Sequence, residues 1–166
     1  MILICYDGSP DSRAAIEHAG ELLDGQPAII LTVWERFVEM LARTSIGLGA
    51  TLGSVDVDEI DKASQQSAEQ LAAEGAELAR HAGLNAQPRT RARVTTIAEA
   101  VLSEADEAGA SAIVMGSRGL GRLGSLLMGS VSHAVVQHAE RPVIIVPSPD
   151  IALERSVKRH AHHTTA

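Results

Sequence analysis

The chain has 166 residues, enough for one domain with a packed core and too few for two of ordinary size. Its formal net charge of −7 and its aromatic content of 2% argue against nucleic-acid binding, which favours a basic surface and, for single strands, aromatic platforms. Hydrophobic residues make up 45% of the chain, as in globular proteins, but no apolar run approaches the roughly 18 residues of a membrane span.

The first apolar run, Ile2–Tyr6, predicts a buried strand that ends at Asp7-Gly8. The chain's single cysteine, Cys5, lies in this run and is interpreted as a small buried hydrophobe rather than a reactive thiol. A lone cysteine cannot form an internal disulfide, and no basic segment precedes the run as it would in a signal peptide. We therefore expect a cytoplasmic protein.

Helix and strand patterns alternate through the first half of the chain. Ser9-Pro10 is typical of a helix N-terminus, and a second strand is predicted from Ala28 to Val33. Residues 35–56, which contain several glycines, are expected to form a short helix and a mobile loop. A three-four spacing of apolar and small residues predicts a long helix from Val57 to Ala82.

The second half continues this alternation. Alternating arginines place a predicted strand, Gln87–Val94, at an edge of the sheet. The remaining predicted elements are a helix over Thr96–Ala108, a strand over Ser111–Met115, a helix over Ser130–Ala139 and a strand over Val143–Val146. This order predicts a single open, mainly parallel five-stranded α/β sheet with helices on both faces, of Rossmann-like type. Ligands of such sheets bind beyond the carboxyl ends of the strands.

Residues 149–166 are interpreted as a polar, histidine-containing tail. His160, His162 and His163 belong to this tail, and we expect them to lack the fixed geometry of a metal site.

Glycines and serines gather between the fourth predicted strand and the last helix. Residues 116–125 read GSRGLGRLGS, and residues 129–132 read GSVS. Glycine lets a backbone approach an anion closely, and the unpaired amides of a helix N-terminus attract phosphate. Ser130 and Ser132 add hydroxyl groups, and Arg118 adds positive charge. The segment therefore predicts a phosphate-binding loop.

Two standard nucleotide motifs fit this loop poorly. A P-loop needs lysine and a Ser/Thr where the chain has Arg122 and Leu123. Gly119, Gly121 and Gly124 match G-x-G-x-x-G, but a dinucleotide site carries that pattern after its first strand. We therefore expect neither a Walker-type NTPase nor a dinucleotide-binding enzyme.

The loop resembles the nucleotide-binding signature of the universal stress protein family, which here is G-x-x-G, nine residues, then G-S, beginning at Gly116. Residues 4–9 and 141–147 are similar to the same family. The resemblance covers residues 1–148, interpreted as one nucleotide-binding domain. It implies the family's ATP-binding subclass, the adenine nucleotide alpha hydrolase-like variety of the Rossmann-like fold, and a nucleotide-dependent regulatory role in the stress response without catalysis.

The resemblance also implies roles for individual residues. Asp7 is expected beside the ribose and adenine, Val33 at the adenine through its backbone, and residues 129–132 at the phosphates. Together with Arg118, the implied nucleotide-binding residues are Asp7, Val33, Met115, Gly116, Gly119, Gly129, Ser130, Val131 and Ser132. The expected ligand is ATP, with AMP or ADP as alternatives and Mg²⁺ only as a companion of ATP.

Many members of this family form homodimers by pairing their last strands. Val143–Val146 is a flat apolar strand expected at the sheet edge, so we expect a homodimer through it, together with a protein partner of unknown identity. Thr95-Thr96-Ile97 departs from the Gly-x-Pro that is frequent after the family's third strand, which leaves the course of that loop open.

Two alternatives to the regulatory role remain: a slow ATPase, and a dimeric scaffold with a vestigial site.

Overall fold

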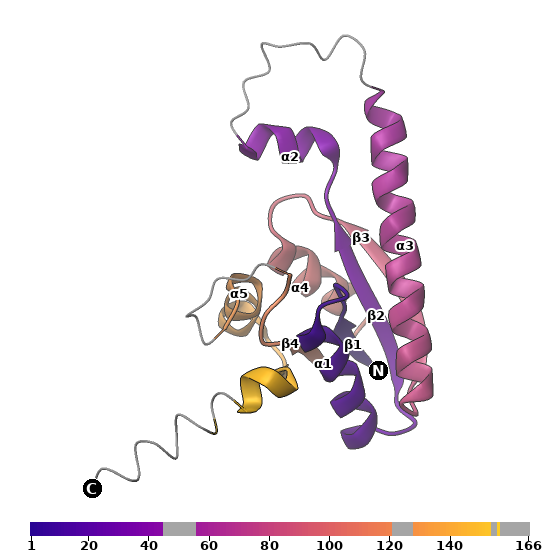
Figure 1. Cartoon of the computed structure of the whole chain (residues 1–166), viewed down its shortest axis with the longest axis vertical. Coiled ribbons are helices and arrows are strands. Elements are labelled where there is room, and N and C mark those ends of the chain that lie inside the picture. Colours follow the sequence, from indigo (N-terminus) through magenta and orange to yellow (C-terminus); the bar gives the residue numbers. More distant parts are fainter. Residues whose placement is uncertain (45–55, 121–127, 154–155, 157–166) are drawn as a thin grey trace, which may run out of the picture.

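The computed structural model describes residues 1–44, 56–120, 128–153 and 156. Within these residues, five strands form one sheet in the order β3-β2-β1-β4-β5, with every neighbouring pair parallel (Figure 1). The strands are β1 (Ile2–Cys5), β2 (Pro27–Trp34), β3 (Asn85–Ala92), β4 (Ala112–Gly116) and β5 (Val143–Val146). The helices are α1 (Pro10–Leu22), α2 (Phe37–Thr44), α3 (Val57–His81), α4 (Ile97–Glu107) and α5 (Ser130–His138).

Helices cover both faces of the sheet, because successive side chains of each strand point to opposite sides. Ile2, Ile4 and Tyr6 pack with α1 and α3 in one core cluster. Leu3 and Ile113 pack with α4 and α5 in a second cluster on the other face. The predicted open parallel α/β sheet with helices on both faces is confirmed.

The long helix α3 packs on the sheet through small residues. Its buried positions are Ala68, Ala72, Gly75, Ala76 and Ala79. Small side chains let a helix lie close to a sheet, so a core can be close-packed with few aromatic residues. This explains how a chain with 2% aromatic content builds two core clusters.

The third strand lies at the sheet edge as predicted, but it begins two residues earlier than Gln87. The register starts with Pro27 opposite Asn85, whose amide donates to the Gln26 carbonyl at 3.0 Å. Asparagine is a poor strand former, so the sequence pattern does not mark this start. The backbone pairing with β2 determines it instead.

The arginines of β3 tie this edge strand to α4. Glu104 of α4, whose side chain is 5% exposed, pairs with Arg89 at 3.1 Å and with Arg91 at 2.9 Å. Arg91 also pairs with Glu107, and hydrogen bonding from Arg91 lowers the pKa of the Glu107 carboxyl. The polar alternation of this strand therefore reflects ion pairing across one face of the sheet.

Two segments outside the sheet bear on the sequence predictions. The short helix expected within residues 35–56 is α2, which lies beyond the carboxyl end of β2 and is joined to α3 by a hydrogen bond from the Phe37 amide to Asp61 (2.7 Å) (Figure 1). The loop expected in the rest of that segment falls on residues 45–55, outside the described residues. In the predicted tail, residues 149–153 are helical and Ile151 is 9% exposed, whereas the tail histidines lie outside the described residues.

Candidate functional site

The strand order reverses at β1, which has β2 on one side and β4 on the other. In open α/β sheets such a reversal opens a crevice at the carboxyl ends of the strands. Asp7 follows β1 and Gly119 follows β4, and the two meet at this reversal: a Cβ atom on Gly119 would lie 2.6 Å from Oδ2 of Asp7. Two residues predicted to bind the nucleotide, 112 positions apart by their numbers, are therefore in contact.

Local backbone structure holds Asp7 in this position. Gly8 has a φ of +78°, which turns the chain sharply after the strand. The Ser9 amide then donates to Oδ1 of Asp7 at 3.0 Å, and Ser9 caps α1 by accepting from the Ser12 amide. The Asp7 carboxylate is thus held by its own turn through one oxygen, while the other faces Gly119.

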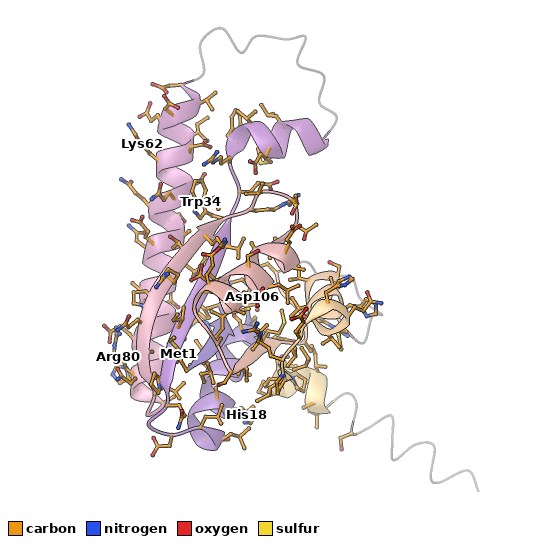
Figure 2. All side chains as sticks on the ribbon, turned by 180° about the vertical axis from the view of Figure 1, so that it is seen from behind. Met1, His18, Trp34, Lys62, Arg80 and Asp106 are labelled. Atoms are coloured by element: carbon orange, nitrogen blue, oxygen red, sulfur yellow. The ribbon has the colours of Figure 1, made fainter. Side chains whose placement is uncertain are left out.

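The end of β2 lies next to this turn. The Tyr6 amide donates to the Leu31 carbonyl at 2.9 Å, and the Thr32 hydroxyl donates to the Tyr6 carbonyl at 2.9 Å. This register places Val33 beside Asp7. Trp34, the chain's only tryptophan, follows at the end of β2 and is partly buried (Figure 2).

The turn after β4 is anchored on α1 by a residue that sequence analysis missed. One oxygen of Asp11, Oδ2, accepts from the Ser117 hydroxyl at 2.8 Å and from the Arg118 amide at 3.0 Å. Asp11 is 5% exposed and Ser117 is fully buried. An acidic residue in the first turn of a helix is common, because it complements the helix dipole, so the sequence offered no distinguishing signal.

The N-terminus of α5 faces the same turn. The Gly129 amide donates to the Ser117 carbonyl at 2.7 Å, and Gly129 is the N-cap residue, with no side-chain cap among the described residues. The next amides, of Ser130 and Val131, are among those that an α-helix leaves without internal partners. The Arg118 Nε atom is also buried and lacks a hydrogen-bond partner in the described part of the chain. Uncapped amides and an unpartnered guanidinium nitrogen are donors from which a phosphate group can accept hydrogen bonds.

Three of the predicted residues take part in the packing of the fold. The Met115 side chain is 4% exposed and packs in the core cluster with α4 and α5. The Ser132 hydroxyl, expected to face a phosphate, instead donates to the Gly116 carbonyl at 2.9 Å. A Cβ atom on Gly116 would lie 2.7 Å from the Asp11 carbonyl carbon, so the absence of a side chain there serves the packing of α1.

The Cys5 thiol at the end of β1 is not a reactive group. Burial, with a smaller contribution from the Asp7 charge, raises the pKa of the Cys5 thiol to about 12, so the thiol is neutral at neutral pH.

Neither a metal site nor a membrane-spanning helix is found in the described residues. Over the ranges that the structure describes, no group of three His, Cys, Asp or Glu residues is arranged to hold a metal ion. None of the described helices is both long enough and apolar enough to cross a membrane.

Comparisons with known proteins find a matching family model and similar proteins. The model of the family described as "Universal stress protein family" matches residues 1–147. A Thermus aquaticus protein named universal stress protein in QAH/OAS sulfhydrylase 3′ region is 33% identical over 150 residues, which cover 87% of this chain and 96% of that protein.

Two solved structures share the fold. The universal stress protein from Archaeoglobus fulgidus in complex with dAMP has a TM-score of 0.55 and 22% identity, over 87% of this chain and 95% of that one. A universal stress protein family protein from Arabidopsis thaliana with AMP bound has a TM-score of 0.57 and 17% identity, over 88% and 90% of the two chains.

Proposed function

Since the chain belongs to the universal stress protein family, we propose that it binds an adenine nucleotide, with ATP as the ligand, in the crevice at the carboxyl ends of β1, β2 and β4. The observation that carries the proposal is the contact of Asp7 with Gly119 beside the uncapped N-terminus of α5. This arrangement puts a carboxylate, a glycine backbone and helix amides together where the strand order reverses. The dAMP and AMP complexes of proteins with the same fold support the choice of an adenine nucleotide.

In this proposal each part of the nucleotide meets a different element. The phosphates lie at the amides of Ser130 and Val131, with the guanidinium of Arg118 supplying positive charge. The ribose lies at the Asp7 carboxylate, which accepts hydrogen bonds from hydroxyl groups. The adenine lies at the backbone of Val33. Mg²⁺ enters only as the companion of the ATP phosphates.

We further propose that the protein is a regulatory module of the stress response rather than an enzyme, and that it works in the cytoplasm. A bound nucleotide regulates a protein when it binds one conformation or assembly more tightly than another. The partner that responds to the nucleotide would then recognise the loaded state.

The test of the proposed function is a titration of the purified protein with ATP, AMP and GTP. Trp34 is the chain's only tryptophan and adjoins Val33, so its fluorescence is expected to change on addition of ATP or AMP and not of GTP. Calorimetry supplies the affinities, and nucleotide released by denaturation is identified by chromatography and mass. Absence of heat and of any fluorescence change with both adenine nucleotides would contradict the proposal.

The two edges of the sheet differ in a way that supports a homodimer through β5. The amides of Asn85 and Arg93 donate to β2, so the alternate positions of β3, including Pro88, face the free edge. Proline has no N–H group, so that edge is poorly suited to pairing with another strand. The β5 segment Val143–Val146 contains neither proline nor charge and is half-buried. We propose that a second copy of the chain pairs with this edge.

A lysine in place of Ile144 is expected to weaken self-association at least about tenfold, because pairing would bury its charge. Sedimentation over a dilution series measures this. The matched control is Thr90→Lys, which adds the same charge to the opposite edge strand, β3, and is expected to leave association unchanged. Both variants are checked for native-like melting. A folded Ile144→Lys variant that sediments like the wild type would overturn the proposed interface.

A further inference from the structure

The peptide unit between Ser117 and Arg118 is bonded at both of its ends. Its N–H group donates to Oδ2 of Asp11 at 3.0 Å, and its carbonyl accepts from the Gly129 amide at 2.7 Å. Because a peptide unit is planar and rigid, its N–H and C=O groups cannot turn independently. The Asp11 carboxylate therefore sets the direction of the carbonyl to which the N-cap of α5 is bonded.

We propose that Asp11 is a positioning residue for the phosphate side of the nucleotide site, acting through the Ser117–Arg118 peptide on the N-terminus of α5. The inference rests on the proposed function, because it concerns the same crevice. Asp11 itself lies in the first turn of α1 and is 5% exposed, and its carboxylate is bonded to the turn, so we expect it to act through the turn rather than by touching the ligand.

The surroundings of Ser117 restrict the orientation of the Ser117–Arg118 peptide. Ser117 is fully buried, its amide donates to the Val146 carbonyl at 2.7 Å, and its hydroxyl donates to the same Asp11 oxygen at 2.8 Å. Removal of the Asp11 carboxylate leaves a part-buried amide and a buried hydroxyl without their acceptor. An unsatisfied buried donor is costly, so the peptide is expected to rotate toward other acceptors and release the Gly129 amide.

This role predicts a selective loss of affinity. The adenine side of the crevice, at Val33 and Asp7, is held by the register of β1 with β2 and by the Ser9 amide, and neither involves Asp11. A change at Asp11 should therefore weaken binding of AMP, which carries a phosphate, and spare binding of adenosine, which does not.

The experiment compares Asp11→Ala and Asp11→Asn by calorimetry with AMP and with adenosine. Asparagine keeps an oxygen acceptor at the position of Oδ2, so Asp11→Asn is expected to bind both compounds as the wild type does. Asp11→Ala is expected to lose at least about tenfold in affinity for AMP and less than about twofold for adenosine. Ser117→Ala removes one of the two hydrogen bonds that hold the Asp11 carboxylate at this turn. It serves as a milder variant with the same direction of selectivity should Asp11→Ala fail to fold.

Hydrogen exchange supplies a readout that does not depend on a ligand. In Asp11→Ala the Arg118 amide is expected to exchange faster than in the wild type, and in Asp11→Asn it is expected to stay protected. Equal losses for AMP and adenosine, or unchanged AMP affinity in a folded Asp11→Ala variant, would overturn the inference while leaving nucleotide binding intact. A wild-type protein that binds neither compound would instead overturn the proposed function, and this role of Asp11 with it.

Discussion

Replacement of Gly129 by valine is expected to reduce the affinity for AMP and ATP at least about a hundredfold in a protein that still folds, as expected when several charge-assisted hydrogen bonds are lost together. Gly129 has a φ of −68°, which any residue adopts, so the substitution introduces no backbone strain. Its Cβ atom would lie 3.4 Å from both the Ser117 carbonyl oxygen and the Arg118 Cα atom. The two methyl groups of valine would then occupy the space between the turn and the first amides of α5, where the proposed site places a phosphate.

The matched control is Gly129→Ala, whose single methyl group meets the turn at an ordinary contact distance. We expect this variant to bind within about tenfold of the wild type, the difference reflecting a weaker N-cap rather than a blocked site. Calorimetry with AMP measures both variants, and thermal melting confirms that both are folded. Wild-type affinity in a folded Gly129→Val protein would mean that the phosphates do not lie at α5.

The elements predicted correctly are those whose signal is local. The apolar runs that became β1 and β4 are bounded by turn residues, and the helix that begins at Pro10 carries a serine cap, so each could be recognised within a few residues. The start of β3 at Asn85 is different, because it depends on pairing with β2 rather than on strand propensity. Hydrophobic periodicity therefore does not locate the ends of an edge strand in which polar residues alternate.

In the candidate site, too, the positions that follow strands could be predicted, and the contacts that depend on packing between elements could not. Asp7 and Gly119 could be expected at the crevice because both follow strands of a parallel sheet, and the structure brings them into contact. The Ser132 hydroxyl has the same local signature as a phosphate donor, but it is turned inward to the Gly116 carbonyl. Asp11 was missed because its hydrogen bond to Ser117 joins residues 106 positions apart. Such a contact depends on how α1 packs on β4, which hydrophobic periodicity does not specify.

The glycines at positions 116 and 119 belong to one sequence motif, yet their alanine variants are expected to fail in different ways. A Cβ atom on Gly116 would lie 2.7 Å from the Asp11 carbonyl carbon and 2.9 Å from the Ser12 amide nitrogen, which are backbone atoms of α1. These backbone atoms cannot move away from the added methyl group unless α1 separates from β4. Gly116→Ala is therefore expected to lower the free energy of unfolding by about 3 kcal/mol, the upper range for overpacking a core.

A Cβ atom on Gly119 would instead meet the Asp7 carboxylate, 2.6 Å from Oδ2, and a side-chain end can move aside. Gly119→Ala is expected to change the free energy of unfolding by less than about 1 kcal/mol, while the displaced carboxylate weakens nucleotide binding by about tenfold. Urea unfolding of both variants without nucleotide, followed by titration with AMP, separates the two effects. If both variants lost only affinity and kept wild-type stability, Gly116 would belong to the ligand site after all. If both lost only stability, the contact between Gly119 and Asp7 would be a packing feature of the fold, and the crevice would lose the feature on which its assignment depends most.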